Sequence, residues 1–230
     1  MIEILVPALA CAEMFSDAPE STMFSIEAAA VEDAVAERRR EFGTVRHCAR
    51  KALGRIGVPA VPVLPDVDGA PQWPVGVVGS MTHCAGYRAA AVARSGELCG
   101  VGIDAESHAP LPDDSLDLIL RHEERARLVQ LARTYPTLHW DRILFCAKEA
   151  VYKAWFPLTR RWLDFADVST TIHPDGTFWA RLRVLGPRVS GVDLDSFSGR
   201  WTVGRGLVVA ATSVGPSPAD TGRNLLAEAV

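Results

Sequence analysis

The chain has 230 residues, of which 48% are hydrophobic and 23% are charged, and it carries a formal net charge of −4. This composition is typical of a folded globular protein with a substantial core, and it excludes a largely disordered chain. The negative net charge gives no reason to expect a nucleic-acid-binding protein.

The five cysteines are scattered, odd in number and without a C-x-x-C pair. This usage favours reduced thiols in a cytoplasmic protein over a disulfide framework or a zinc ribbon. No apolar run approaches the roughly 18 residues that a membrane-spanning helix requires, so no membrane association is expected.

The first half of the chain predicts a strand, a long helix and three further strands. Residues 1–15 lack the basic start of a signal peptide and predict an opening strand. Residues 25–53 are rich in Ala, Glu and Arg at helical spacing and predict one continuous helix. The proline-rich residues 58–76 predict an extended loop. Strands are then expected over 75–81, 87–94 and 98–104.

The second half predicts two helices followed by two hairpins. Helical patterns cover residues 115–133 and 137–155. An Asp-Gly pair between β-rich arms predicts a hairpin over 167–185. A second hairpin is expected over 199–214.

This order of elements indicates an α+β fold with two halves of similar size. We expect the first half to cover residues 1–105, with the basic helix, a histidine loop and the strand that carries the first metal carboxylates. The second half would cover 106–215, and the polar residues 216–230 are expected to be a disordered tail.

Two acidic residues end one of the predicted strands. In "GVGIDAES", residues 100–107, Asp104 and Glu106 are two positions apart and therefore project from the same face of a strand. Two carboxylates that close repel each other unless a cation lies between them, and hard divalent ions prefer oxygen ligands. The alternative is a strand end that turns two unrelated acids into solvent.

A third carboxylate lies between two lysines in "FCAKEAVYKAW", residues 145–155. Glu149 and Lys153 are i, i+4 neighbours on the predicted helix, and as an exposed pair they would contribute roughly a few tenths of a kcal/mol. Near Asp104 and Glu106, however, Glu149 would complete a magnesium site. The two lysines would then neutralise phosphate groups.

Polar residues between two predicted strands suit phosphate oxygens. "GSMTHCAGYR", residues 79–88, supplies Ser80, Thr82 and His83, although a lone histidine is more often structural. The His-Cys pairs at 47–48 and 83–84 lack a recognisable zinc spacing. Seven basic residues lie between positions 38 and 55, and one or two of them could hold a terminal phosphate through bidentate contacts.

Four motifs in this order resemble the surfactin-type 4'-phosphopantetheinyl transferases, in particular their actinobacterial branch. They are "GAP" (69–71), "SMTHC" (80–84), "VGIDAE" (101–106) and "FCAKEAVYKAW" (145–155). The resemblance implies a monomer of two similar α/β halves related by a pseudo-two-fold axis, with coenzyme A in the cleft between them. It also implies transfer of the phosphopantetheine arm to a serine of apo acyl-carrier or peptidyl-carrier proteins, with release of 3',5'-ADP.

The same resemblance assigns roles to individual residues. Asp104, Glu106 and Glu149 would bind Mg²⁺, with Mn²⁺ as a possible substitute, and Glu149 and Lys153 would be catalytic. The serine proton would pass to Glu149 or to a metal-bound hydroxide. Arg160, Arg161 and Trp162 are candidates for binding an acidic carrier protein, or else form an ordinary connector with a buried tryptophan. The residues that would contact coenzyme A are Arg38, Arg46, Thr82, His83, Lys148 and Lys153.

One loop departs from the family pattern. Related enzymes often have a lysine or arginine before the Gly-x-Pro element, near the adenine end, whereas this chain has Asp66 and Asp68. The residues that hold the adenine are therefore left open. Two other functions also remain open: a magnesium-dependent phosphohydrolase of nucleotide-like diphosphates, and a non-catalytic module that binds coenzyme A or carrier proteins.

Overall fold

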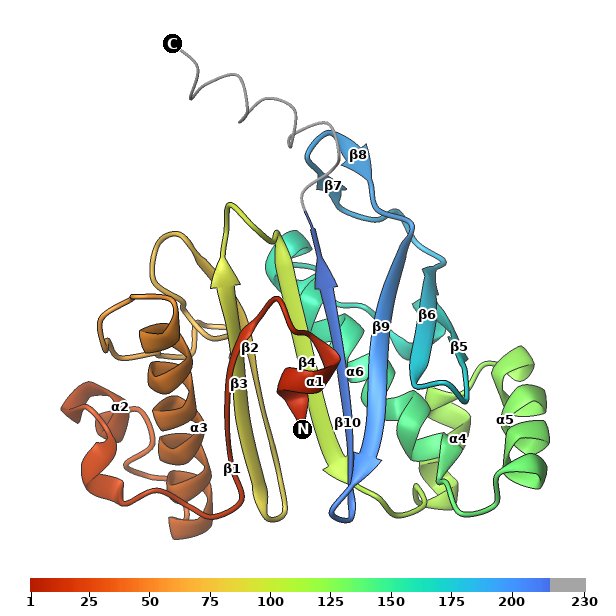
Figure 1. Ribbon diagram of the computed structural model, residues 1–230, viewed down its shortest axis with the longest axis horizontal. Coiled ribbons are helices and arrows are strands. Elements are labelled where there is room, and N and C mark those ends of the chain that lie inside the picture. The colour runs from red at the N-terminus through yellow and green to blue at the C-terminus, as the bar shows by residue number, and fades with distance from the viewer. Residues whose placement is uncertain (216–230) are drawn as a thin grey trace.

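The computed structural model describes residues 1–215, which form an α+β protein (Figure 1). The predicted tail over 216–230 lies outside the described residues. The helices and strands, in chain order, are α1 (Ile2–Leu5), β1 (Ala10–Met14), η1 (Glu20–Thr22), α2 (Ser25–Ala29), α3 (Ala36–Arg55), β2 (Val77–Cys84), β3 (Tyr87–Arg94), β4 (Gly100–Ser107), α4 (Asp113–Ile119), α5 (His122–Thr134), α6 (Trp140–Thr159), η2 (Phe165–Asp167), β5 (Val168–Ile172), β6 (Thr177–Leu182), β7 (Arg188–Val189), β8 (Val192–Asp193), β9 (Ser196–Gly204) and β10 (Leu207–Val214).

Two antiparallel sheets, each packed against a 20-residue helix, form the two halves. Helix α3 packs on the sheet of order β1-β3-β2, and α6 packs on the sheet of order β4-β10-β9-β6-β5. This arrangement confirms the predicted α+β class. Strand β4 pairs with β10 over its whole length, so it belongs to the second sheet. The boundary expected at residue 105 therefore falls inside a strand, and the halves divide between β3 and β4 instead.

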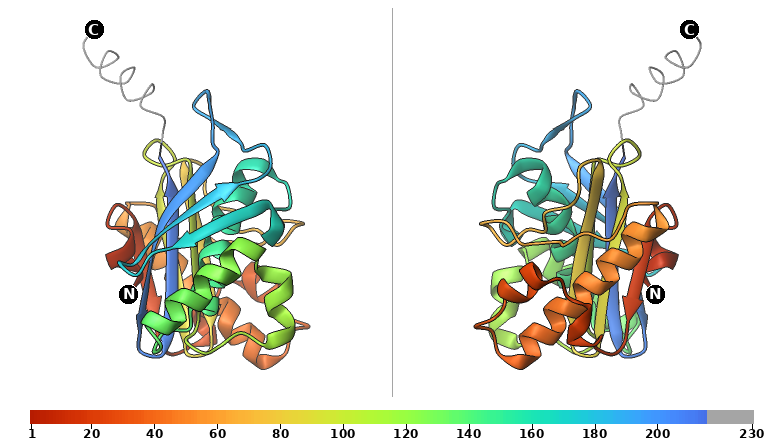
Figure 2. Two further views of the ribbon diagram at one scale, coloured as in Figure 1. Left: turned by 90° about the vertical axis from the view of Figure 1, so that its right-hand side faces the viewer. Right: turned by 90° about the vertical axis from the view of Figure 1, so that its left-hand side faces the viewer.

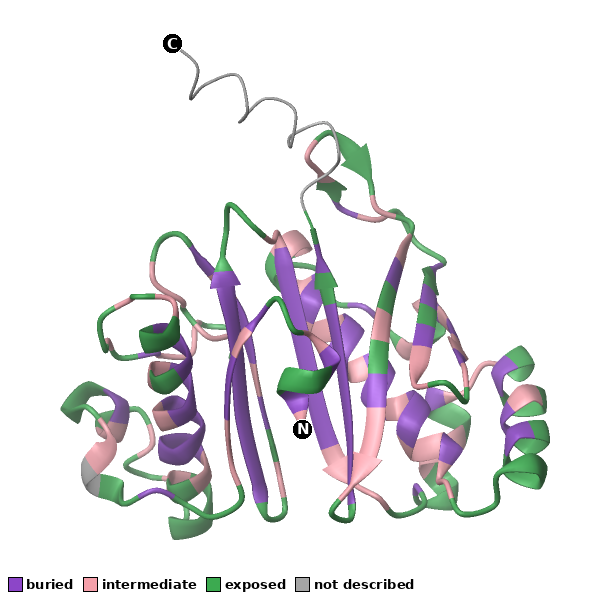
Figure 3. Ribbon diagram, in the orientation of Figure 1, coloured by how far each residue is buried: buried purple, intermediate pink, exposed green. Residues whose placement is uncertain are grey.

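The central strands are buried on both faces. Strands β3, β4 and β10 are buried over most of their length (Figure 3). Ile103 and Ala105 of β4 face a cluster that includes Ile2 and Leu5 of α1. Helix α6 lies on the opposite side of the strands from α1 (Figure 2). Since neighbouring residues of a strand alternate between faces, Asp104 and Glu106 point toward α6.

Two hydroxyl groups join the halves where β2 runs beside β4. The Ser80 hydroxyl accepts a hydrogen bond from the backbone N–H of Ile103 at 3.1 Å, and the Thr82 hydroxyl accepts one from Ala105 at 3.0 Å. Both side chains are buried. Strand β2 thus extends beyond the predicted 75–81 to Cys84 and includes Thr82, because it pairs with β3 over its whole length. Its two hydroxyls also satisfy backbone donors of β4.

The glycine at position 102 lets α6 approach β4 closely. A Cβ atom at Gly102 would lie 1.8 Å from the carbonyl oxygen of Ala150, a backbone atom that no side-chain rotation can move. The helix that carries Glu149 and Lys153 can therefore sit against the strand that carries Asp104 only because this residue has no side chain.

Replacing Gly102 with alanine is expected to lower the free energy of unfolding, at the upper end of the range of about 1–3 kcal/mol for overpacked cores. Gly96 is the matched control, because a Cβ there meets no atom within 4 Å. Urea unfolding of both variants provides the measurement. Equal stability of Gly102→Ala and Gly96→Ala would contradict the close packing of β4 and α6.

Two predicted helices are each divided in the structure. The helix predicted over 25–53 is split into α2 and α3, because buried Glu27 of α2 pairs with Arg50 of α3 at 2.8 Å and folds the first segment back on the second. The helix predicted over 115–133 breaks at Leu120, whose backbone is extended, and α5 begins beyond it.

The other predicted helices and strands are present except at the N-terminus. Both predicted hairpins are present as β5–β6 and β9–β10. The N-terminal segment forms the short helix α1 before β1, rather than a single strand. The β7–β8 hairpin was not predicted.

Within residues 1–215, none of the helices combines the length and apolar character needed to cross a bilayer.

Candidate active site

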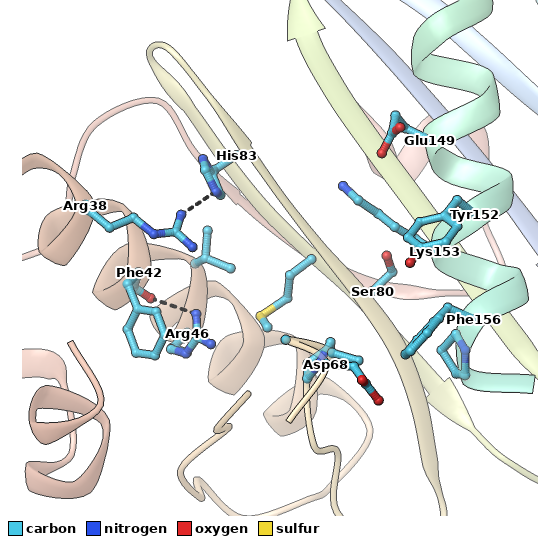
Figure 4. A pocket seen from close by; sticks show the side chains of 16 residues that line it. Arg38, Phe42, Arg46, Asp68, Ser80, His83, Glu149, Tyr152, Lys153 and Phe156 are labelled. Atoms are coloured by element: carbon cyan, nitrogen blue, oxygen red, sulfur yellow. Dashed lines mark hydrogen bonds between the residues drawn. The ribbon is translucent and has the colours of Figure 1, made fainter. Parts of the chain in front are cut away.

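A pocket of about 280 Å³ lies between the two halves (Figure 4). Helix α3 and strand β2 form one wall, α6 forms the other, and the 58–76 loop closes one side. The structure brings together residues that are more than 100 positions apart in the chain. Those that the sequence singled out are Arg38, Arg46, Asp68, Ser80, His83, Glu149 and Lys153.

The carboxylate of Asp104 lies at the inner end of this site. Its Oδ1 accepts a hydrogen bond from Lys153 Nζ at 2.7 Å and another from the Thr82 hydroxyl at 3.2 Å. Its Oδ2 is buried and has no hydrogen-bond partner among the described residues. A buried carboxylate oxygen without a partner is costly, so this atom points to a ligand that the protein itself does not supply.

Glu149 is the most perturbed acid of the site. Burial, together with repulsion from Asp104 and Glu106, raises the pKa of Glu149 to about 7, with Lys153 opposing the shift. Burial and Asp104 also raise the pKa of Glu106, although Arg142 Nη1 lies 3.1 Å from Glu106 Oε2 and opposes this shift. The three predicted carboxylates therefore lie close enough to interact electrostatically.

These acids fit a hard divalent cation by their chemistry, but they do not converge on one point. Among residues 1–215, no group of three or more His, Cys, Asp or Glu side chains is arranged to hold a metal. Lys153 occupies Oδ1 of Asp104, and Arg142 occupies Glu106. The unpartnered Oδ2 of Asp104 and the repulsion among the three carboxylates are compatible with oxygen ligands of a divalent cation.

Lys153 carries the positive charge at the centre of the site. Burial lowers the pKa of Lys153, but Asp104 and Glu149 outweigh this effect and raise it above the ordinary value. The ammonium group therefore stays charged at neutral pH. It is the group on the α6 wall that can attract an anion.

Two arginines from α3 and the imidazole of His83 from β2 face it across the pocket (Figure 4). Arg38 Nη1 is 2.8 Å from His83 Nε2. The Arg46 guanidinium lies 3.1 Å above the ring centroid of Phe42 and donates from Nε to the Val63 carbonyl at 2.9 Å. Both arginines were predicted to bind coenzyme A, and the structure places both in this wall.

The other arginines of α3 are neutralised by acids that precede the helix. The pairs are Arg39–Glu20 at 3.3 Å, Arg40–Asp17 at 3.7 Å, Arg50–Glu27 at 2.8 Å and Arg55–Glu3 at 3.8 Å. The N-terminal segment thus removes most of the basic patch seen in the sequence. Arg38 and Arg46 are the arginines of this helix that line the pocket.

Known proteins resemble this chain over nearly its whole length. The family profile described as the 4'-phosphopantetheinyl transferase N-terminal domain matches residues 26–93, and that of the 4'-phosphopantetheinyl transferase superfamily matches residues 100–210. The 4'-phosphopantetheinyl transferase Svp of Streptomyces mobaraensis is 54% identical over 96% of this chain and 92% of its own length. The chain belongs to the 4'-phosphopantetheinyl transferase family.

Two further transferases support this assignment. PptT of Mycobacterium tuberculosis is 53% identical over 88% of this chain and 91% of its own length. Npt of Nocardia iowensis is 44% identical over 92% of this chain and 98% of its own length. A phosphohydrolase, the alternative left open by the sequence, has no support in these matches.

Lys148 of the transferase makes its contacts inside the protein, in contrast to the sequence-based prediction. Its ammonium donates to the Ile119 carbonyl at 2.9 Å, to Glu124 Oε2 at 2.8 Å and to the Phe165 carbonyl at 3.1 Å. The Lys148 side chain is 2% exposed. Because all three N–H donors are occupied inside the protein, this geometry gives Lys148 a structural role in place of the predicted contact with coenzyme A.

Thr82 is also buried, and it does not line the pocket. Its hydroxyl accepts from Ala105 and donates to Asp104, and the side chain is 2% exposed. The prediction that Thr82 contacts phosphate is therefore replaced by a role in positioning Asp104. Ser80, which was not assigned to the coenzyme, is the hydroxyl residue of this strand that lines the pocket.

The segment after α6 contacts the 58–76 loop, which closes one side of the pocket. Arg160 Nη1 pairs with Asp66 Oδ2, so the unusual acid of the 58–76 loop ties that loop to the end of α6. Arg161 donates to the Leu185 carbonyl at 2.5 Å. Trp162 is 74% exposed and lies 5.1 Å from the Tyr152 ring, which excludes the buried tryptophan considered in the alternative.

A second, smaller pocket of about 140 Å³ shares Glu149 and Tyr152 with the first. Trp162, Leu163, Phe165 and Val168 make its walls largely apolar, and Lys148 and Asp164 also line it. The transferase therefore has one pocket that carries basic side chains and a second, more apolar pocket, and the two meet at Glu149.

Two residues of the site were missed in the sequence. Arg142 contacts Glu106 and donates to the carbonyls of Ala109 and Pro110 at 3.0 and 3.1 Å, which holds the end of β4 in place. Helical spacing could have found it, since Arg142, Glu149 and Lys153 are separated by seven and four residues. No sequence pattern indicates the role of Glu124, because its partner Lys148 lies on a different helix.

Proposed function

We propose that this transferase moves the 4'-phosphopantetheine arm of coenzyme A onto a serine of apo acyl-carrier or peptidyl-carrier proteins. The observation that carries the proposal is the position of Glu149 where the two pockets meet, with Lys153 lining the first of them. A diphosphate beside Lys153 would place the nucleotide end toward Arg38, Arg46 and His83. The uncharged arm would then extend into the apolar pocket.

In the reaction, the serine oxygen attacks the β-phosphorus of coenzyme A. The bond from the serine oxygen to phosphorus forms, the diphosphate bridge breaks, and 3',5'-ADP leaves. Glu149 accepts the serine proton, a role supported by its place where the two pockets meet. Lys153 offsets the negative charge that develops on the leaving diphosphate oxygen.

We propose Asp104, Glu106 and Glu149 as the residues that would hold Mg²⁺, or Mn²⁺ in its place. A divalent cation there supplies charge neutralisation on the diphosphate oxygens. Thr82 supports this site by orienting Asp104. Arg142 supports it by orienting Glu106.

We further propose that carrier proteins dock on the exposed segment at the end of α6. Arg161 and Trp162 are exposed there, although Arg161 also donates to the Leu185 carbonyl, and Arg160 is held by Asp66. The order of the four motifs also supports membership of the surfactin-type branch. We propose in addition that the enzyme is monomeric and cytoplasmic, and that its two halves are related by a pseudo-two-fold axis.

The test is to mix the protein with coenzyme A, Mg²⁺ and an apo-carrier domain and to measure the intact mass of the carrier. A gain of one phosphopantetheine arm on the carrier serine is expected, and a chelator is expected to prevent it. Free phosphopantetheine without carrier modification would indicate a hydrolase, and neither product would indicate a binding module. Restoration by Mn²⁺ after chelation would show which cations the three carboxylates accept.

A further inference from the structure

A carboxylate that the reaction does not use lies beside the cationic wall of the pocket. Glu41, in the second turn of α3, faces three positively charged or titratable side chains from three elements. Its Oε2 lies 3.5 Å from His83 Nδ1 and 3.7 Å from Arg38 Nη1, and its Oε1 lies 3.5 Å from Arg88 Nη2. The Glu41 side chain is 17% exposed, whereas Arg38 is 50% exposed and reaches the pocket.

The partners of His83 determine where its proton lies. Arg38 Nη1 approaches His83 Nε2 at 2.8 Å, and a guanidinium has only donors, so Nε2 must accept. The ring proton is therefore on Nδ1, the nitrogen that faces Glu41. Without ligand, His83 is thus a neutral imidazole whose Nε2 occupies a donor of Arg38.

Glu41 places a negative charge beside the proposed phosphate site at Arg38 and His83. A carboxylate in this position would by itself repel a phosphate ligand. Arg88 holds Glu41 from the side away from the pocket: it is 8% exposed and also contacts Asp17 Oδ1 at 3.2 Å. Glu41 therefore cannot easily turn away. Its remaining oxygen stays directed at His83 and Arg38.

The Glu41 carboxylate stabilises His83 when the imidazole is protonated. Burial lowers the pKa of His83, and Arg38 from α3, Lys153 from α6 and Arg88 from β3 lower it further, while Glu41 raises it. A phosphate placed between Arg38 and Nε2 adds negative charge on the pocket side. With Glu41 on the other side, the imidazolium would have an anionic partner at each nitrogen.

We propose that Glu41 is a positioning residue that makes the pocket select the terminal 3'-phosphate of coenzyme A. It keeps a proton on Nδ1 of His83, so that Nε2 takes a second proton from solvent when the phosphate binds. The hydrogen bond between Arg38 and His83 then breaks, and both side chains donate to the phosphate. This inference rests on the proposed function, which places the 3'-phosphate end at Arg38 and His83.

The kinetic test compares coenzyme A with 3'-dephospho-coenzyme A as donor to an apo-carrier domain. Glu41→Gln keeps the size of the side chain and removes its charge. We expect KM for coenzyme A to rise about tenfold, with kcat unchanged, because binding of the phosphate is lost and the reacting atoms are not touched. KM for 3'-dephospho-coenzyme A is expected to stay the same. Glu37→Gln, an exposed acid on the same helix, is the matched control and should change neither donor.

A binding measurement tests the proton separately from activity. Calorimetry of 3',5'-ADP near neutral pH, in buffers of different ionisation enthalpy, is expected to show proton uptake by the wild-type protein and less uptake by Glu41→Gln. Binding of 5'-AMP, which lacks the 3'-phosphate, should show none. In a His83→Gln background, Glu41→Gln should have no further effect on 3',5'-ADP affinity, since Glu41 acts through His83.

Equal changes of KM for both donors in Glu41→Gln would overturn the proposal, because a structural role alone would produce them. Absence of proton uptake by the wild-type protein on binding 3',5'-ADP would also overturn it. Failure of the wild-type protein to modify a carrier with either donor would instead contradict the proposed function. The calorimetric comparison of 3',5'-ADP with 5'-AMP would still decide the role of Glu41.

Discussion

Glu149→Gln is expected to lower kcat/KM for carrier modification by at least about a hundredfold, the contribution typical of a general base. Glutamine has nearly the same size but cannot accept the serine proton, and it is a weaker ligand for a divalent cation. Because glutamine is nearly isosteric with glutamate, we expect the fold to stay intact. The measurement is the rate of carrier mass gain under saturating coenzyme A.

The same substitution is expected to stabilise the metal-free protein at neutral and higher pH. The folded-state pKa of Glu149 is about 7, above its ordinary value of 4.5, so the unfolded chain releases this proton first. Stability therefore falls as pH rises through this window, and the loss is complete above about 7. Glutamine removes the ionisation, so the Tm of Glu149→Gln should exceed that of wild type at pH 8 and match it at pH 4.

The matched control is Glu97→Gln, an exposed acid in the turn between β3 and β4. It should leave both the rate and the Tm unchanged. Wild-type turnover in Glu149→Gln would contradict the catalytic assignment. A lower Tm at pH 8 in the absence of divalent cations would contradict the repulsion among Asp104, Glu106 and Glu149.

Lys148→Met is expected to lower the free energy of unfolding by about 3–5 kcal/mol, the cost of removing one partner from a buried ion pair. The ammonium holds Glu124, whose side chain is 1% exposed, and two backbone carbonyls. Methionine fills the space of the lysine stem but leaves the Glu124 carboxylate buried without a cation. Urea unfolding at constant pH measures the loss.

The second variant is Lys148→Met combined with Glu124→Gln, which removes the stranded charge. It should be more stable than Lys148→Met alone. Lys51→Met, an exposed lysine on α3, is the control and should change stability little. If Lys148→Met instead keeps wild-type stability and loses affinity for 3',5'-ADP, then the contact with coenzyme A predicted from the sequence is correct and the structural role is wrong.

Local sequence patterns were sufficient for much of the secondary structure. The Asp-Gly turn between β5 and β6 fixed a hairpin, because that dipeptide adopts the backbone angles that a tight turn requires. The helix break at Leu120 was not visible, since the residues on either side keep helical composition. The break depends on Glu124 capping the next helix while it binds Lys148. That contact is distant in sequence.

The sequence by itself determined the family, the α+β class and the presence of Asp104, Glu106, Glu149 and Lys153 as a set, because each lies in a short motif whose order is readable. Only the tertiary structure decided which basic residues face the pocket. Arg38 and Arg46 line the pocket, whereas the other arginines of α3 pair with acids that precede the helix and Glu124 holds Lys148 inside the protein. A charge in a sequence carries no information about its partner, since pairing depends on positions in space that only the folded chain brings together.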